Sequence, residues 1–389
     1  MAADNTFCLN DFDAIGFDLD HTIAKYKLNE VMSLTYDSLA KYLIEKKGYD
    51  KVLLEPMETD KDFLIRGLVF DIKLGNFLKL SEDGKILRAS HGRKKMTDEE
   101  IEQDYGKDKK WHEFEELKET LKQTDNFRYF ENSFDLPGSI LCARIIDLID
   151  KKENKRPEKY EFLPDVWAAF GNCYSRENFA ANTGDFFPSV KKNPEKYYEK
   201  CSEGLKKWLR SLKESGKYVF LCTSSHVDYA KFLLEFILGS DWQSYFNLCI
   251  TYARKPGFFR NTPAERPFFK LDNDIETKEV VTDLESNKIY SQGNAENLMG
   301  LLRKVTEKEN PKVAYIGDSL RSDVHPVAQL ENWYALLVLE EMEVESLNGK
   351  VDNDGDEPLA KKRYTVSNLM VSICVNNNPK GIPPEGHFL

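Results

Sequence analysis

The period of the apolar positions changes several times along the chain, and each change predicts an element. Uncharged residues precede two aspartates, Asp18 and Asp20, which predicts a short buried strand over about residues 13–17. Over residues 28–48 the apolar positions recur every three or four residues, and two lysines and a glycine close the segment, as at the end of a helix. Residues 66–92 have the pattern of strands joined by Gly-Asn and Asp-Gly turns.

The remainder of the chain has two regions of different character. From Thr97 to about Lys200 it is charged and predicted to be mostly helical. After that, short apolar strands alternate with amphipathic helices, which is typical of a parallel, doubly wound sheet. The predicted strands lie in KYVFLCTSS, YFNLCITYARKPGFF, VAYIGDSLRSD and NWYALLVLEE.

The predicted organisation is discontinuous. The ~180 residues between the first strand and the later series are too many for a loop, so they contain a second domain. We expect residues 1–26 and 201–345 to form an α/β core that also receives strands from residues 64–92. Residues 27–200 are then mainly an inserted, mostly helical domain. Residues 346–389 are an acidic link followed by a Pro/Gly-rich arm.

Composition narrows the class of protein. With 55 basic and 66 acidic residues in 389, the formal charge is −11, which argues against an extended nucleic-acid surface. The seven cysteines form no CxxC pair, which favours reduced thiols in the cytosol. The N-terminus has no secretory pattern, and no apolar run reaches the ~18 residues of a membrane span. A cytoplasmic protein without a membrane partner is expected.

Polar groups follow four of the predicted strands, where ligands of open parallel sheets bind. These groups are Asp18 and Asp20, Thr223 and Ser224, Arg254 and Lys255, and Asp318 and Asp323. Each pair alone is also explained by a turn or a helix cap. Together they supply carboxylates, a hydroxyl and a lysine, which suit a divalent cation and a phosphate. Oxygen ligands with few imidazoles favour Mg²⁺ over zinc or copper.

Four motifs carry a resemblance to a known family. The segments DLDHT, LCTSS, ARKP and GDSLRSD resemble the motifs of haloacid dehalogenase-type phosphatases. Together with RGLVFDIKLGNFLK and IYSQGN, the ARKP variant is similar to the cytosolic purine 5′-nucleotidase family, from Phe12 to about Glu341. The resemblance implies a haloacid dehalogenase-like core, with an inserted and mostly helical cap domain.

The resemblance also implies a role for each motif residue. Asp18 is the nucleophile that forms an aspartyl-phosphate, and Asp20 is the general acid and base. Period-two alternation directs both side chains to one side. Mg²⁺ is expected on Asp18, Asp318 and the Asp20 backbone carbonyl. Thr223 is expected to bind a phosphoryl oxygen, Lys255 to neutralise its charge, and Asp323 to orient Lys255 or metal-bound water.

Other positions depart from that family. Ser224, expected to contact the substrate, stands where relatives commonly carry asparagine. Trp167 and Gly171 stand where purine-selective relatives carry an arginine and an aspartate that contact the base. Phe134 matches an aromatic residue that stacks on the base, and Trp167 also offers a ring for stacking, although a core aromatic is an alternative for Phe134. Purine specificity is therefore not carried over.

The leading functional hypothesis is a Mg²⁺-dependent phosphatase, 5′-nucleotidase-like, that acts on small phosphate monoesters such as nucleotides. The alternative is a weakly active or inactive protein that uses the phosphatase fold as a binding scaffold, since fold does not fix function. A phosphotransferase that passes the group from Asp18 to a nucleoside shares the same residues. The sequence does not identify the substrate, and it is compatible with a homo-oligomer.

Overall fold

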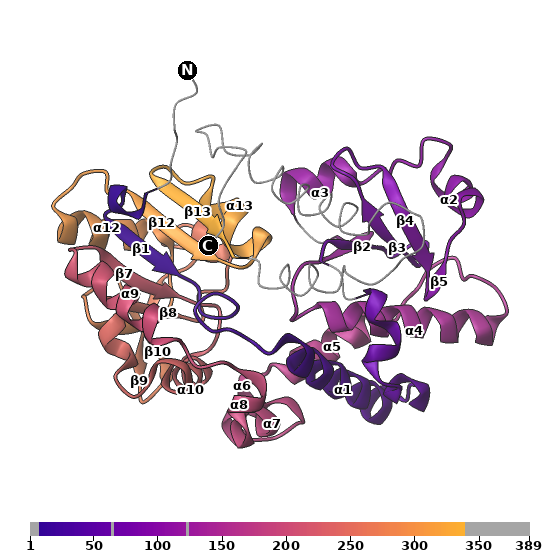
Figure 1. Ribbon diagram of the computed structural model, residues 1–389, viewed down its shortest axis with the longest axis horizontal. Coiled ribbons are helices and arrows are strands. Elements are labelled where there is room, and N and C mark those ends of the chain that lie inside the picture. The colour runs from indigo at the N-terminus through magenta and orange to yellow at the C-terminus, as the bar shows by residue number, and fades with distance from the viewer. Residues whose placement is uncertain (1–7, 64–65, 122–123, 339–389) are drawn as a thin grey trace. The chain divides into compact units, whose positions relative to one another are not determined.

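The computed structural model describes residues 8–63, 66–121 and 124–338 (Figure 1). These residues divide into two compact units. Unit 1 contains residues 8–26 and 198–338, and unit 2 contains residues 27–197. Each unit is built on its own sheet.

Unit 1 is a mixed α/β structure on an eight-stranded sheet of order β10-β9-β11-β8-β7-β1-β12-β13. The strands from β11 to β13 in this order are parallel, and β9 and β10 are antiparallel additions at one edge. The parallel strands are β1 Ala14–Phe17, β7 Tyr218–Cys222, β8 Leu248–Thr251, β11 Lys288–Gln292, β12 Val313–Gly317 and β13 Trp333–Leu337. The antiparallel strands are β9 Phe268–Asp272 and β10 Ile275–Val281.

The first strand of the sequence lies in the middle of this sheet, between β7 and β12 (Figure 1). Ala14 pairs with Tyr218 on one side and with Val313 on the other. Gly16 allows close packing there, because a Cβ would lie 2.3 Å from the Phe220 ring and 2.7 Å from the Tyr315 ring. β1, β7 and β12 are buried throughout, as their continuous apolar runs predict.

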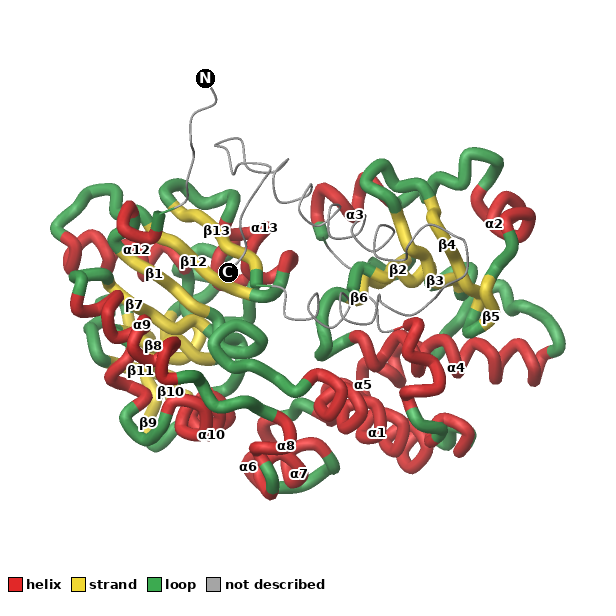
Figure 2. The backbone as a smooth tube through the Cα atoms, in the orientation of Figure 1, coloured by secondary structure: helices red, strands yellow, loops and turns green. Residues whose placement is uncertain are grey.

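Helices accompany the parallel strands of unit 1 (Figure 2). They are α9 Glu203–Glu214, α10 Val227–Leu238, α11 Gly257–Arg260, α12 Ala295–Thr306 and α13 His325–Val327. α9 and α12 both contact β7. Ser202 caps the N-terminus of α9, where its hydroxyl accepts from the Leu205 amide, and Asn294 caps α12 in the same way. The alternation predicted after residue 200 is therefore present.

Unit 2 contains a five-stranded antiparallel sheet of order β5-β4-β3-β2-β6. Its strands are β2 Leu68–Asp71, β3 Asn76–Leu80, β4 Ile86–His91, β5 Lys94–Lys95 and β6 Phe127–Phe130. The expectation that strands from residues 64–92 join the core sheet is wrong. Within the described residues they pair with one another and with β6, because short turns make them antiparallel neighbours before any other strand can intervene.

The helices of unit 2 include three that pack together, α1, α4 and α5. The helices are α1 Leu28–Lys47, α2 Asp98–Tyr105, α3 Phe114–Thr120, α4 Leu136–Glu153, α5 Leu163–Cys173, α6 Arg176–Ala181, α7 Phe186–Lys192 and α8 Pro194–Tyr197. α1 ends as predicted at Gly48, which has φ 75°. The buried guanidinium of Arg144 joins α4 to the segment before the sheet, since it donates to the Asp60 carboxylate and to two backbone carbonyls.

The two connections between the units run side by side. Tyr26 and Tyr198 form an isolated antiparallel bridge. The bridge is extended in unit 1 by the Glu199 amide, which donates to the Lys25 carbonyl, and in unit 2 by the Lys27 amide, which donates to the Tyr197 carbonyl. The chain therefore leaves unit 1 and returns to it at neighbouring positions.

The mixed α/β fold with a large, mainly parallel sheet is confirmed, and several elements differ from expectation. β6 and the β9–β10 hairpin were not predicted, and the helix expected after Thr97 is interrupted after Tyr105 by Gly106. No helix in residues 8–63, 66–121 and 124–338 is long and apolar enough to cross a membrane. The predicted link and arm over residues 346–389 lie outside the described residues.

Candidate active site

The four polar strand ends predicted from the sequence belong to adjacent strands of unit 1. β8, β7, β1 and β12 are consecutive and parallel in the sheet, so their carboxyl ends share one edge (Figure 1). Asp18 follows β1 directly, Thr223 follows β7, and Asp318 follows β12. Lys255 lies four residues beyond the end of β8.

Lys255 is the centre of the charged contacts at this edge. Its ammonium lies 2.8 Å from Asp18 Oδ1 and 2.6 Å from Asp323 Oδ1, and it donates to the Tyr315 hydroxyl at 3.1 Å. Its side chain is 2% exposed. Tyr315 in turn donates to the Cys222 carbonyl at 2.9 Å. The lysine is therefore held between two carboxylates in a buried environment.

Burial and neighbouring charges shift the pKa values of Asp18 and Lys255. Burial raises the pKa of Asp18 to about 7, against the opposing effect of the Lys255 charge, and the nearby Asp323 and Asp20 add to the rise. Burial also disfavours the charged form of Lys255, but Asp18 and Asp323 outweigh it and hold the pKa of the ammonium above its ordinary value. A buried lysine that stays charged is thus balanced by more than one carboxylate.

Three buried carboxylates could hold a cation. One oxygen from each of Asp18, Asp318 and Asp323 lies within 4.8 Å of the other two. Three carboxylates against one ammonium leave net negative charge in a site from which water is largely excluded, and hard oxygen donors of this kind suit a divalent ion. Asp18 and Asp318 were expected as metal ligands. Asp323 was not, since it was predicted to orient Lys255 or metal-bound water.

Asp323 has both carboxylate oxygens engaged by the protein. Oδ1 contacts Lys255, and Oδ2 accepts from the Ser319 amide at 3.1 Å. It packs so closely on Gly317 that a Cβ there would lie 2.5 Å from Asp323 Cγ. These contacts fit the predicted orientation of Lys255 by Asp323.

Asp20 is surrounded by hydroxyl groups. Its Oδ2 accepts from Ser225 at 2.7 Å and from Thr223 at 3.4 Å, and its Oδ1 accepts from Tyr26 at 2.6 Å. Ser224 is exposed, and its hydroxyl accepts from the Lys255 amide at 3.0 Å. The structure thus brings Asp18, Asp20, Thr223, Ser224, Lys255, Asp318 and Asp323 together at one edge of the sheet.

Sequence reasoning missed three polar contacts at this edge, those of Ser225, Tyr315 and Tyr26. Ser225 is the third hydroxyl residue of LCTSS, directly beside the two residues that were singled out. Tyr315 lies in the apolar run VAYIG, where a tyrosine is ordinarily a packing residue, and Tyr26 lies between Lys25 and Lys27. The hydroxyl of a buried tyrosine needs a partner, and that requirement was the available signal.

The predicted base-stacking residues Phe134 and Trp167 belong to unit 2. The Arg128 guanidinium lies 3.9 Å from the centre of the Trp167 ring, so a cation already stacks on one face of this ring. Phe134 meets Tyr174 edge to face, with 5.9 Å between ring centres. Gly171 is exposed, with no atom within 4 Å of a Cβ built on it.

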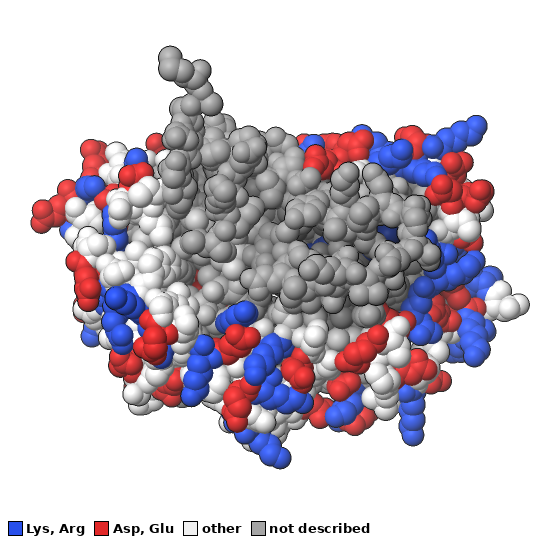
Figure 3. Space-filling model, in the orientation of Figure 1, with Lys and Arg blue, Asp and Glu red and all other residues white. Residues whose placement is uncertain are grey.

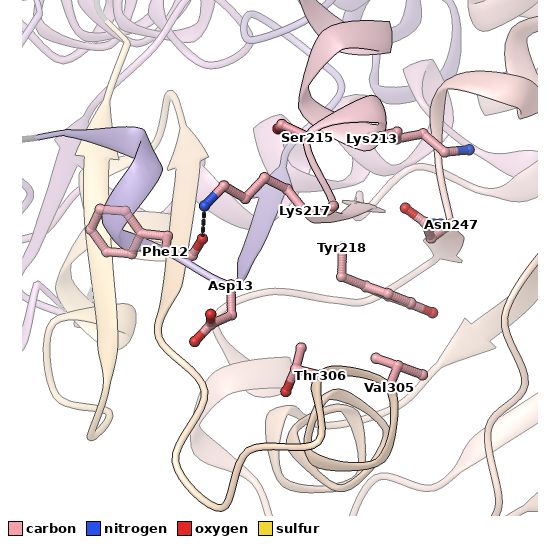
Figure 4. Close-up of a pocket in the computed structure, with 10 residues that line it drawn as sticks. Phe12, Asp13, Lys213, Ser215, Lys217, Tyr218, Asn247, Val305 and Thr306 are labelled. Carbon is pink, nitrogen blue, oxygen red and sulfur yellow. Dashed lines mark hydrogen bonds between the residues drawn. The ribbon is translucent and has the colours of Figure 1, made fainter.

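A cavity of about 490 Å³ lies at the opposite, amino-terminal ends of β1 and β7 (Figure 4). It contains none of the predicted site residues. The Lys217 ammonium there donates to the Asn10 and Phe12 carbonyls, and Lys213 donates to the Ser244 and Phe246 carbonyls. Both ammonium groups are therefore engaged by backbone carbonyls.

Comparison with known proteins identifies the family. A sequence model of the 5′ nucleotidase family matches residues 2–376. The chain belongs to the 5′ nucleotidase family. It is 44% identical over 356 residues to human 5′-nucleotidase domain-containing protein 1, covering 92% of this chain and 78% of that protein. The bovine protein of the same name is 42% identical over 92% of this chain and 77% of its own length.

A more distant relative is human 5′-nucleotidase domain-containing protein 2, with 28% identity over 88% of this chain and 63% of that protein. Membership makes the chain a nucleotidase-like phosphatase, which is a hydrolase. The family and the group of Asp18, Asp318 and Asp323 both indicate a divalent metal cofactor. The resemblance to the 5′-nucleotidase family recognised in the sequence is confirmed.

Proposed function

We propose that the protein is a Mg²⁺-dependent phosphomonoesterase of the haloacid dehalogenase type, with unit 1 as its catalytic core and unit 2 as its cap. The observation that carries the proposal is the position of the Lys255 ammonium, 2.8 Å from Asp18 and 2.6 Å from Asp323, at the carboxyl ends of the central strands. A buried cation beside a buried carboxylate is suited to phosphoryl transfer, in which positioning and charge stabilisation do most of the catalysis.

In the first proposed step a carboxylate oxygen of Asp18 attacks phosphorus. The bond from phosphorus to the leaving oxygen breaks, and Asp20 gives its proton to that oxygen, which leaves as an alcohol. Asp18 then carries the phosphoryl group as an acyl phosphate. Splitting hydrolysis in this way replaces one difficult step with two easier ones.

In the second step water attacks the phosphorus of the aspartyl-phosphate and Asp20 accepts a proton from it. The bond between phosphorus and Asp18 breaks, which releases orthophosphate and restores both carboxyl groups. Lys255 neutralises charge on Asp18 and on the phosphoryl oxygens, and the Thr223 hydroxyl donates to one of those oxygens. Ser224 is proposed as a further contact to the substrate.

Asp18, Asp318 and the Asp20 backbone carbonyl are the proposed ligands of Mg²⁺, with Asp323 orienting Lys255. When bound, the ion would polarise the phosphoryl group and offset the repulsion between the carboxylates and the substrate dianion. The small radius and oxygen preference of Mg²⁺ suit a site with several carboxylates.

The proposed substrates are small phosphate monoesters, and nucleoside 5′-monophosphates in particular. Support comes from the family, and Phe134 and Trp167 are the residues proposed to contact the base. Because Arg128 covers one face of Trp167, a base would use the other face or the guanidinium plane. A cytoplasmic location is proposed because every cysteine in the described residues is a free thiol.

The test is phosphate release from a panel of nucleotides, sugar phosphates and phosphoserine, with Mg²⁺ and with a chelator. We expect release that needs Mg²⁺, is strongest on nucleotides and is lost in Asp18→Asn. The matched control is Asp283→Asn, which removes an exposed carboxylate of the same unit. Activity that persists in Asp18→Asn contradicts the mechanism.

Two alternatives give different results in the same assay. Tight nucleotide binding without release in the wild-type protein would identify a scaffold. Transfer of phosphate to an added nucleoside, at the expense of orthophosphate, would identify a phosphotransferase.

A further inference from the structure

Three tyrosine hydroxyls form a hydrogen-bonded chain that ends on Asp20. The Tyr26 hydroxyl donates to Asp20 Oδ1 at 2.6 Å and lies 2.8 Å from the Tyr229 hydroxyl. The Tyr229 hydroxyl lies 3.1 Å from that of Tyr198. These residues come from three distant parts of the sequence, and all of them belong to unit 1.

Two of the three tyrosines are enclosed by protein. Tyr26 is 2% exposed and Tyr198 is 1% exposed, whereas Tyr229 is half-buried. A tyrosine hydroxyl, whose ordinary pKa is about 10, keeps its proton at neutral pH. Tyr26 therefore stays a neutral group beside the carboxylate.

The position of Tyr26 is fixed by its surroundings. Its backbone forms the bridge to Tyr198, and the two rings meet edge to face with 4.9 Å between centres. The His21 ring packs on Tyr26 at 4.2 Å. The Tyr26 hydroxyl is thus a rigid partner for Asp20 Oδ1, while Ser225 holds Oδ2 from the other side.

We propose that Tyr26, supported by Tyr229 and Tyr198, is a positioning residue that holds the Asp20 carboxyl group for proton transfer in both half-reactions. The proposal rests on the proposed function, in which Asp20 alternates between acid and base. A hydroxyl suits both states, because it donates to a carboxylate and accepts from a carboxylic acid. An ammonium or guanidinium in its place could only donate, and it would favour the ionised form that cannot protonate a leaving group.

Leaving-group dependence separates positioning from a general structural defect. A nucleoside 5′-monophosphate releases an alkoxide that needs a proton, whereas p-nitrophenyl phosphate releases a phenolate that leaves without one. The value of kcat/KM reports the steps up to loss of this group. In Tyr26→Phe we expect the ratio of kcat/KM for the nucleotide to that for the nitrophenyl ester to fall about tenfold, part of the roughly 10²–10⁴-fold that general acid catalysis supplies.

Three further variants calibrate the measurement. Asp20→Asn should lower the same ratio by about 100-fold or more, because it removes the acid itself. Tyr218→Phe is the matched control, since this tyrosine of unit 1 bonds Ser286 at the start of β7 and should leave the ratio unchanged. Tyr229→Phe leaves the bond between Tyr26 and Asp20 in place, and should lower the ratio by a smaller factor, about threefold.

The outcomes separate the positioning role of Tyr26 from the acid–base role of Asp20 on which it rests. An unchanged ratio in Tyr26→Phe, with a large fall in Asp20→Asn, overturns the role of Tyr26 alone. An equal loss on both substrates in Tyr26→Phe also overturns it, because that result reports structural damage. An unchanged ratio in Asp20→Asn removes the acid role of Asp20 and with it both proposals. If Tyr26→Phe does not fold, the Tyr229→Phe ratio decides.

Discussion

Replacing Asp18 with asparagine should make the protein more stable at neutral and alkaline pH in the absence of divalent ions. The carboxylate is buried beside Asp323 and Asp20, and burial raises its pKa from 3.8 to about 7 in the folded protein. The folded state therefore binds the proton more tightly than the unfolded chain. The stability from this proton is fully present below pH 4 and is lost as the pH rises through 7.

The size of the effect follows from the same pKa values. One pKa unit corresponds to about 1.4 kcal/mol, so a rise from 3.8 to about 7 corresponds to a loss of about 4 kcal/mol above pH 7. Asparagine has nearly the same shape and does not titrate. The difference in unfolding free energy between Asp18→Asn and wild type should therefore grow by about 3 kcal/mol between pH 5 and pH 8.

The assay is urea unfolding of both proteins in EDTA at several pH values across that range. Asp283→Asn serves as control, because it makes the same substitution at an exposed carboxylate of the same unit. Adding Mg²⁺ at pH 8 should stabilise the wild type and not Asp18→Asn, since a bound ion offsets the buried charge. A difference that is flat with pH, or that falls as the pH rises, would refute the reasoning.

Three further substitutions test other contacts. Lys255→Met leaves Asp18 and Asp323 facing each other without their shared ammonium. It should lower the unfolding free energy by about 3–5 kcal/mol, measured by urea unfolding, and kcat by roughly 100-fold or more, measured by phosphate release. Arg144→Met should cost about 3–5 kcal/mol in urea unfolding by removing a buried guanidinium from its carboxylate and carbonyl partners, and unchanged stability would contradict this. Gly317→Ala places a Cβ 2.5 Å from Asp323 Cγ and should reduce kcat about 100-fold through a shift of the lysine, with a small change in circular dichroism. Wild-type turnover in Gly317→Ala would show that Asp323 can move without consequence.

The charged centre was largely predictable because strand ends of a parallel sheet obey a simple rule. Each predicted strand placed its polar residues at the carboxyl edge, and adjacency in the sheet then brought Asp18, Thr223, Lys255 and Asp318 together. The adjacency of these strands was an assumption from the sequence alone, and the strand order of the sheet supplies it. The motifs left open whether Asp323 orients Lys255 or metal-bound water, and in the structure its Oδ1 lies 2.6 Å from the Lys255 ammonium.

Two features were missed or misassigned: the β9–β10 hairpin, and the sheet to which the strands from residue 66 onwards belong. β10 has mostly exposed or half-exposed side chains and lies at a sheet edge, so its hydrophobic signal is weak, although Asn273-Asp274 in its turn has the positive φ angles of a hairpin. The strands from residue 66 onwards were recognised as strands but assigned to the wrong sheet. Local pattern predicts strand character, whereas the choice of sheet depends on which partners the chain can reach.

The paired connections at Tyr26 and Tyr198 have a consequence for how the protein folds. β1 is an interior strand of the unit 1 sheet and is synthesised first, yet its neighbours β7 and β12 follow only after the whole of residues 27–197. Closing a flexible loop of that length costs roughly 4–5 kcal/mol of chain entropy. If unit 2 folds first, its own contacts bring Lys27 and Tyr197 together, and the later strands then add to β1 at little further entropic cost. In that order the inserted unit acts as an intramolecular clamp for assembly of the sheet that carries the active site.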